Sequence, residues 1–208
     1  MSMISMDDLV HDLIERNNLR SPEIVSAFQK IGRKHFVTEE MADEAYANSP
    51  LPIGHGQTIS QPLTVAFMLE LLQPKRGQKI LDVGSGSGWT TSLLAEIAGE
   101  TGHIFAIERV SELKEFGQKN VEKFHFYNID FFCMDGSKGL PDHAPFDRIL
   151  VSAAAQEVPE ALKRQLAKGG RMVIPTVADD LRVIVRRLDG TFAEHEYPGF
   201  VFVPLLED

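Results

Sequence analysis

The stretch KILDVGSGSGWTTSLLAEIAG, from Lys79 to Gly99, carries the strongest structural signal in this sequence. An apolar strand ends at Val83, a loop with glycines at Gly84, Gly86 and Gly88 follows, and the stretch continues as an apolar helix. Such glycines allow a tight turn and a close approach of the backbone to a ligand. Open α/β sheets bind ligands beyond the carboxyl ends of their strands, so this loop is predicted to bind one.

The rest of the chain alternates between helical and extended patterns, which indicates a mostly parallel sheet covered on both faces. Two final β segments around the turn Asp189–Gly190 are expected to add an antiparallel edge. The predicted fold class is therefore α/β: a Rossmann-like doubly wound sheet with an antiparallel C-terminal edge and additional N-terminal helices. The other predicted strands are 103–108, 129–133, 146–152 and 171–176, and the other predicted helices are 62–72, 110–124 and 158–170.

The first part of the chain is predicted to be helical. Ser21 and Thr38 are expected to cap helices, with Pro22 at the first position of the Ser21 helix. Residues 1–61 are expected to form a helical cover with a substrate loop, and residues 62–208 the core, within one compact unit. The residues expected to face inward are Leu9, Leu13, Ile14, Ile24, Val25, Phe28 and Ile31.

Composition excludes several classes of protein. The 208 residues are 43% hydrophobic and 25% charged, and no apolar run is long enough for a membrane span. Asp7 and Asp8 stand where a signal peptide would be basic, and the single cysteine, Cys133, suits the cytoplasm. We therefore expect a cytoplasmic protein that acts without a membrane. A monomer is expected as well, although composition does not determine the oligomeric state.

Charge and motif patterns argue against nucleic acid and metal as partners. The net charge is −9, whereas nucleic-acid binding is driven by basic surfaces. The basic cluster Arg182, Arg186 and Arg187 is interpreted as a solvated strand face. The histidines form no HxxxH pattern and there is no CxxC, so no metal site is predicted.

Carboxylates follow the predicted strands next to the glycine loop. Glu108 ends the strand after the loop, 20 residues beyond Gly88, where a carboxylate can accept hydrogen bonds from ribose hydroxyls. Asp135, followed by Gly136, comes after the next strand and could accept from an adenine amino group. Each acid also has a plain structural interpretation, but one adenosyl site explains all of them together.

The glycine spacing narrows the choice of cofactor. In a dinucleotide fingerprint the third glycine would fall at Trp89 or Thr91, and the Lys-Ser/Thr ending of a phosphate-binding P-loop is missing. The acid-x-Gly-x-Gly-x-Gly form, Asp82 to Gly88, resembles motif I of the class I S-adenosylmethionine-dependent methyltransferases. Asp82 is then placed to influence the ammonium group of that cofactor, or to cap loop amides.

A closer resemblance covers the chain from about Lys34 onward. LPIGHGQTISQP, LDVGSGSG, FDRILVSAAAQEVPEAL, LAKGGRMVIP and GFVFVPL resemble, in order, the protein-L-isoaspartate O-methyltransferases. This resemblance implies methyl transfer from S-adenosyl-L-methionine, leaving S-adenosyl-L-homocysteine, to the free α-carboxylate of L-isoaspartyl residues in damaged proteins. The methyl ester then collapses to a succinimide that can reopen to aspartate.

The resemblance also assigns residues. Ser60 is the implied active-site residue, which donates a hydrogen bond to the carboxylate or holds the loop around it. Because a carboxylate is already ionised at neutral pH, no general base is required. The implied cofactor residues are Thr58, Ile59, Asp82, Gly84, Ser85, Gly86, Gly88, Glu108, Asp135 and Gly136, and the implied substrate residues are Ser60, Ala153, Ala154 and Val203.

Some positions depart from the family pattern, including Gly32, His55, Leu63 and the loop 175–180. They bear on substrate range and turnover. Two alternatives therefore stay open: a methyltransferase acting on another carboxylate or a small molecule, and a cofactor-binding module without catalysis.

Ser60 has a second interpretation, as the N-cap of the helix that begins near Pro62. A cap bonds to the amides two and three residues further on, and Pro62 has no amide. Only the amide of Leu63 would then be available.

Overall fold

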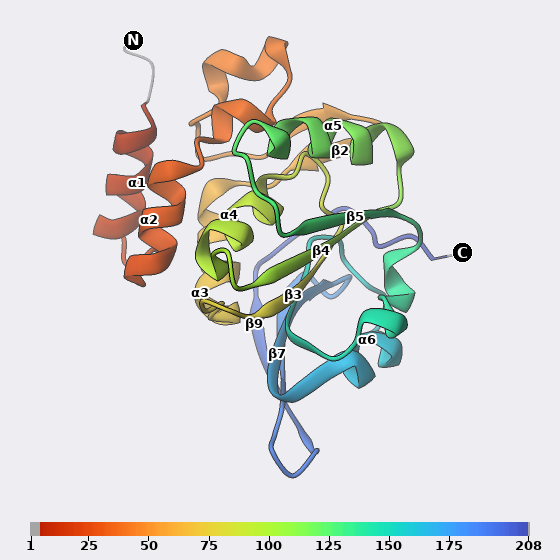
Figure 1. Cartoon of the computed structure of the whole chain (residues 1–208). Coiled ribbons are helices and arrows are strands. Elements are labelled where there is room, and N and C mark those ends of the chain that lie inside the picture. The colour runs from red at the N-terminus through yellow and green to blue at the C-terminus, as the bar shows by residue number, and fades with distance from the viewer. Residues whose placement is uncertain (1–4, 208) are drawn as a thin grey trace.

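The computed structural model describes residues 5–207, so the outer ends of the two predicted segments, residues 1–4 and 208, lie outside the described residues. Its centre is a seven-stranded sheet of order β5-β4-β3-β6-β7-β8-β9 (Figure 1). Strands β5 to β7 in this order are parallel, and β8 is antiparallel to both neighbours, which confirms the predicted fold class. The strands are β3 (Lys79–Val83), β4 (His103–Glu108), β5 (Ile129–Cys133), β6 (Phe146–Val151), β7 (Leu166–Thr176), β8 (Asp180–Arg186) and β9 (Phe192–Pro198).

Both faces of the sheet are buried, as a doubly wound sheet requires. Ile80 of β3 belongs to a hydrophobic core on one face of the sheet. Leu81, the next residue, belongs to a second core on the opposite face. The first face carries α3 (Pro62–Leu72), α4 (Trp89–Ala98) and α5 (Ser111–Glu122), and the second carries α6 (Glu160–Gln165). This burial explains why the central strands are continuous apolar runs.

The N-terminal helices α1 (Met6–Glu15) and α2 (Pro22–Lys30) pack beside α3 and α4 (Figure 1). The buried stripe of α1 is Leu9, Val10 and Leu13. The inward orientation predicted for Ile14 is wrong, because its position lies at the edge of that stripe and leaves it 44% exposed. The predicted stripe of α2 is mostly confirmed, with Val25 half-buried.

Ser21 is the N-cap of α2, but its hydroxyl does not cap its own helix. The buried carboxylate of Glu70 in α3 instead accepts the backbone N–H groups of Arg20 and Ser21, each at 2.7 Å, and the Ser21 hydroxyl at 2.8 Å. A negative charge is favourable at the positive end of a helix. Glu70 therefore connects the N-terminal helices to the segment predicted as the core.

Two predicted helices differ from the structure. The segment after Thr38 forms only a 3₁₀ turn, Glu39–Glu44, without a side-chain cap bond from Thr38. Helix α6 ends at Gln165 rather than 170, because Leu166 pairs with Phe146 of β6 and the chain enters β7 there. At Leu166 a long-range partner outweighs the local helical preference.

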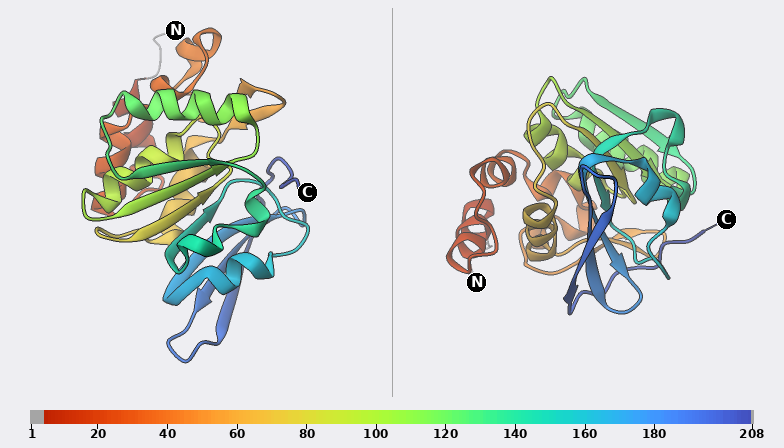
Figure 2. Two further views of the ribbon diagram at one scale, coloured as in Figure 1. Left: turned by 45° about the vertical axis from the view of Figure 1, so that its right-hand side comes forward. Right: turned by 90° about the horizontal axis from the view of Figure 1, so that it is seen from below.

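A short hairpin of β1 (Leu51–Gly54) and β2 (Gln57–Ile59) precedes α3, where only irregular structure was expected. His55, at its turn, has φ 53, between two glycines that also have positive φ. A second hairpin, β8–β9, extends away from the body of the protein (Figures 1 and 2). In the described part of the chain, no helix is long and apolar enough to cross a membrane.

Candidate active site

A cleft lies beyond the carboxyl ends of β3, β4 and β6, where the sequence places the binding loop. The cleft is open to solvent and contains about 860 Å³ of space between the protein atoms, with the solvent at its mouth included. The β1–β2 hairpin, the glycine loop and the C-terminal segment form its walls. The predicted site residues that line it are Thr58, Ile59, Ser60, Gly84, Ser85, Gly86, Glu108, Gly136, Ala153 and Val203.

The glycine loop is fixed to the neighbouring strand β4. Gly84 and Ser85 donate their amides to the carbonyl of Ile107, at 2.9 and 3.0 Å. Gly88 does not line the cleft: a Cβ there would lie 2.8 Å from the Gly117 carbonyl oxygen of α5, and its φ is +86. Gly88 is therefore required for packing beneath the loop, whereas Gly84 and Gly86 face the cleft.

Glu108 stands at the end of β4 with both carboxylate oxygens held by the backbone. Its Oε2 accepts from the amide of Gly86 and its Oε1 from the amide of Val110, each at 2.9 Å. A carboxylate has about four acceptor sites, so two remain for a ligand that enters the cleft. Two ribose hydroxyls are suitable donors for them.

Asp82 lies directly behind the loop and is completely buried. Its Oδ2 accepts hydrogen bonds from the hydroxyls of Thr90 and Thr91, at 2.9 and 2.7 Å. Burial raises the pKa of Asp82 to about 6, and the nearby charge of Glu108 contributes to this rise. Within residues 5–207, Oδ1 of Asp82 and the hydroxyl of Ser85 are buried without a hydrogen-bond partner. Unpaired buried polar atoms beside a cleft are consistent with a polar ligand such as the amino-acid end of S-adenosylmethionine.

Asp135 is also behind the cleft wall, and its carboxylate accepts from the amide of Ser137 at 2.8 Å and pairs with Lys138 at 3.3 Å. The adjacent Gly136 lines the cleft. A Cβ on Gly136 would lie 2.4 Å from Cγ1 of Val83, so this glycine allows the loop to pack against β3. To bind adenine as predicted, the carboxylate of Asp135 would have to accept a further hydrogen bond, from the adenine amino group.

Ser60 lies at the end of β2 on the cleft, one residue before the helix cap. The N-cap of α3 is Gln61. The amide of Leu63, which Ser60 was expected to cap, instead donates to the side-chain oxygen of Asn48 at 3.0 Å. The interpretation of Ser60 as the N-cap is therefore wrong. Among the described residues, the Ser60 hydroxyl has no hydrogen-bond partner, which leaves it available to a ligand.

The C-terminal segment crosses to the same cleft. The amide of Ala154 donates to the carbonyl of Val203 at 2.8 Å, and the amide of Leu205 donates to the carbonyl of Ala154 at 2.7 Å. Ala154 thereby anchors the segment from outside the lining, while Ala153 and Val203 face the cleft. This pairing keeps the predicted substrate residues together although about 50 residues separate them in sequence.

Arg33, which was not predicted as a site residue, lies behind Ser60. Its guanidinium is buried and donates to the carbonyl of Ser60 at 3.1 Å and to that of Ile59 at 3.4 Å. Burial lowers the pKa of Arg33 to about 10. A single arginine between apolar segments was the only available signal, because its partners are backbone carbonyls, which no sequence pattern marks.

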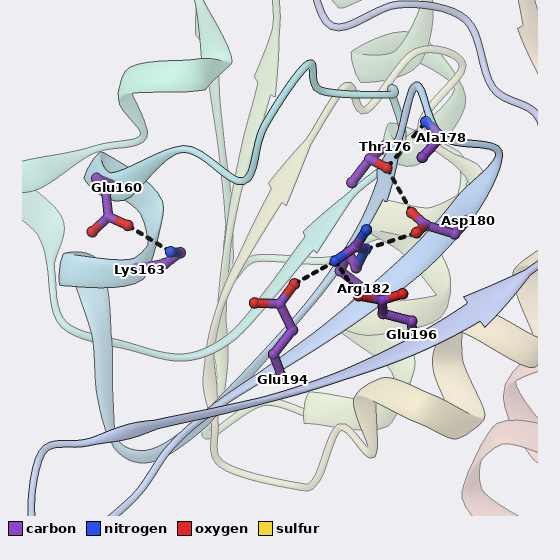
Figure 3. Close-up of polar contacts among 8 residues, drawn as sticks. All are labelled: Glu160, Lys163, Thr176, Ala178, Asp180, Arg182, Glu194 and Glu196. Atoms are coloured by element: carbon purple, nitrogen blue, oxygen red, sulfur yellow. Dashed lines mark hydrogen bonds and ion pairs between the residues drawn. The ribbon is translucent and has the colours of Figure 1, made fainter.

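The basic cluster on β8 lies away from this cleft. Arg182 is surrounded by carboxylates: its guanidinium binds Asp180 at 2.7 Å, Glu194 at 2.9 Å and Glu196 at 2.6 Å (Figure 3). Arg186 donates to the carbonyl of Leu166 at 2.6 Å. Arg182 and Arg186 are both only partly exposed and are bonded within the protein, so the interpretation of the cluster as a solvated strand face is not confirmed for these two residues. Within the described residues, no cluster of side chains suited to a metal ion is found.

Comparison with known proteins decides the family. A model of the family "Protein-L-isoaspartate(D-aspartate) O-methyltransferase (PCMT)" matches residues 4–208. The chain belongs to this family. A protein-L-isoaspartate O-methyltransferase of Ignicoccus hospitalis is 42% identical over 205 residues, covering 97% of both chains. One of Methanothrix thermoacetophila is 42% identical over 191 residues, covering 91% of this chain and 90% of its own.

A solved structure agrees with the PCMT assignment. A Plasmodium falciparum protein described as a PCMT, in complex with S-adenosyl-L-homocysteine, has a TM-score of 0.86 at 26% identity. The match covers 98% of this chain and 99% of that one. The similarity of this PCMT family member to its relatives therefore includes the N-terminal helices, the core and the C-terminal segment.

Proposed function

We propose that this protein transfers a methyl group from S-adenosyl-L-methionine to the free α-carboxylate of L-isoaspartyl residues in damaged proteins and peptides. The observation that carries the proposal is that one cleft is lined both by Ser60 and by the Gly86–Glu108 pair. An acceptor group and an adenosyl cofactor can therefore meet there. Labelling of an isoaspartyl peptide, and not of its aspartyl twin, tests the proposal.

Glu108, the glycine loop and Asp82 would hold the cofactor. Bound S-adenosylmethionine supplies the methyl group as an electrophilic carbon on a positively charged sulfur. The free acceptor sites of Glu108 suit the ribose hydroxyls, and the unpaired Oδ1 of Asp82 suits the ammonium group, directly or through water. We assign Thr58, Ile59, Ser85 and Gly136 to the walls of the same pocket.

Ser60 has the role of orienting the acceptor carboxylate. Its free hydroxyl can donate one hydrogen bond to that group while the second carboxylate oxygen points toward the methyl carbon. A hydroxyl without a base nearby cannot remove a proton, and an ionised carboxylate needs no such help. The task of the protein is alignment and the exclusion of water, to which buried Ile53, Val65 and Trp89 contribute apolar walls.

Ala153, Ala154 and Val203 would support the substrate chain around the isoaspartyl residue. The backbone bonds of Ala154 to Val203 and Leu205 hold the C-terminal segment at the cleft. The methylated peptide, which now carries a neutral ester, leaves the cleft. The backbone nitrogen of the following residue then attacks the ester carbonyl, loses its proton and expels methanol, and the succinimide that forms begins repair. We propose that the protein works as a cytoplasmic monomer, and the single exposed thiol of Cys133 suits a reducing compartment.

A further inference from the structure

Arg33 is an enclosed positive charge whose hydrogen-bond partners are all backbone carbonyls. Its side chain is 1% exposed, and the guanidinium donates to five carbonyl oxygens at 2.8 to 3.4 Å. Within residues 5–207, Arg33 forms no ion pair with a carboxylate, and its Nε has no partner. Burial of an unneutralised charge is costly, so this arrangement is unusual for a residue that only fills space.

The carbonyl partners of Arg33 come from two parts of the chain. Three belong to the loop before the hairpin: Ala45, Ala47 and Ser49. The other two, Ile59 and Ser60, are residues of the cleft wall. The planar guanidinium offers several donors in a fixed arrangement, which a flexible ammonium group does not. Arg33 therefore joins the loop and the cleft wall through one rigid group.

The charge of Arg33 lies one layer behind the cleft. Its guanidinium carbon is 5.4 Å from the ring of Trp89, and Trp89 itself lines the cleft. The guanidinium is closed to solvent, so solvent screens its charge less than it screens an exposed charge, and the five carbonyl dipoles are the groups that oppose it. A negatively charged group placed at Ser60 would lie within reach of this field.

We propose that Arg33 is a positioning residue that fixes the Ser60 peptide unit and makes the cleft select anionic acceptors. This inference rests on the proposed function. The substrate carboxylate is an anion, whereas the methyl ester is neutral, so the field of Arg33 favours binding of substrate over product. The fork of hydrogen bonds governs alignment and hence turnover, while the charge governs the preference for an anion.

Two variants separate the hydrogen bonds of the planar guanidinium, called the fork here, from its positive charge. Arg33→Lys keeps a cation but loses the planar fork, and Arg33→Met loses both. Arg16→Met, at the exposed C-cap of α1, is the matched control. Turnover of an isoaspartyl peptide is measured together with the inhibition constant of the corresponding isoasparaginyl peptide, in which a neutral amide replaces the carboxylate. Affinity for S-adenosylhomocysteine is measured by calorimetry as a check that the cofactor half of the cleft is intact.

Turnover is expected to fall about tenfold or more in both Arg33 variants, because alignment is lost. The preference for the isoaspartyl over the isoasparaginyl peptide should fall about fivefold or more in Arg33→Met and stay close to wild type in Arg33→Lys. Affinity for S-adenosylhomocysteine should change less than about twofold. An unchanged preference in Arg33→Met, or a loss of cofactor affinity parallel to the loss of turnover, would overturn the inference. If Arg33→Met does not fold, unchanged turnover in Arg33→Lys overturns it alone.

Hydrogen exchange provides a readout that does not depend on the substrate. Amides of residues 57–61 should exchange faster in both Arg33 variants, with unchanged exchange in β3 and α4. Equal exchange in wild type and variants would contradict the positioning role even if the wild type methylates its substrate normally. Failure of the wild type to label an isoaspartyl peptide would instead contradict the proposed function, and the exchange data would still decide whether Arg33 holds Ser60.

Discussion

The amide of Gly86 donates a hydrogen bond of 2.9 Å to Oε2 of Glu108. This bond connects the loop after β3 to the end of β4, so the backbone that would face the cofactor and the carboxylate that would hold its ribose are placed as one unit. Replacing Glu108 should therefore affect the loop and the ribose contacts together.

Glu108→Ala is expected to weaken binding of S-adenosylhomocysteine by about 1–3 kcal/mol, the scale of lost hydrogen bonds to a charged group. Calorimetry measures this change directly. Glu112→Ala, on the exposed start of α5, is a suitable control. An affinity within twofold of wild type would show that Glu108 does not hold the ribose.

Asp82 should make stability fall as pH rises. Its folded pKa, about 6, lies above the ordinary value of 3.8, so the folded state binds the proton more tightly than the unfolded state. The free energy of unfolding is then lost between about pH 4 and pH 6, by roughly 3 kcal/mol in total. Denaturant titrations of Asp82→Asn should lack this loss. The free energy of unfolding of the variant, relative to that of wild type, should therefore rise with pH.

The same Asp82→Asn substitution is expected to weaken cofactor binding, because the amide brings N–H donors to a site that would accept from an ammonium group. The exposed Asp142→Asn controls for the change of net charge. For the stability prediction above, a constant difference in the free energy of unfolding between Asp82→Asn and wild type from pH 4 to pH 7 would contradict a pKa of Asp82 raised by burial.

Ser60→Ala should lower turnover strongly while affinity for S-adenosylhomocysteine and thermal stability stay close to wild type. The reason is that the hydroxyl has no partner in the described protein and does not cap α3. Steady-state kinetics with a labelled cofactor provide the measurement, and Ser111→Ala on the exposed start of α5 is the control. Full turnover in Ser60→Ala would remove Ser60 from the mechanism.

The glycines of the loop should divide into two kinds. Gly88→Ala should destabilise the fold by more than the ~1 kcal/mol of backbone strain, because its Cβ would lie 2.9 Å from Cγ2 of Val121 as well as against Gly117. Gly84→Ala carries the same backbone strain, because Gly84 has φ +78, but it meets no atom closer than 3.8 Å, so it should destabilise the fold less and also lower cofactor affinity. Thermal melts with and without S-adenosylhomocysteine distinguish them, and equal destabilisation by both would contradict this division.

The sequence was a good guide where local pattern and tertiary structure agree. The strand before Gly84 and the acid at Glu108 follow from the alternation of strands and helices, because parallel strands place their carboxyl ends at one edge. It was a poor guide where a residue far away in the sequence forms the hydrogen bond or strand pairing that a local pattern had assigned to a neighbour. Asn48 binds the amide that Ser60 was expected to cap, and Leu166 leaves its helix to pair with Phe146.

Arg33 marks the limit of sequence reasoning for the site. Its partners are carbonyl oxygens spread from Ala45 to Ser60, and every residue type offers the same oxygen. Which carbonyls converge is decided by the path of the loop and the hairpin, and the hairpin residues Leu51, Ile53 and Ile59 are buried in the core shared with distant elements. Only the folded chain reveals the contact.

The most direct test of the central claim is methylation of a matched pair of peptides that differ only in one isoaspartyl or aspartyl linkage, with labelled S-adenosyl-L-methionine. We predict base-labile label in the isoaspartyl peptide alone, followed by appearance of the succinimide. Equal labelling of both peptides, or labelling of neither by a protein that binds S-adenosylhomocysteine, would contradict the account.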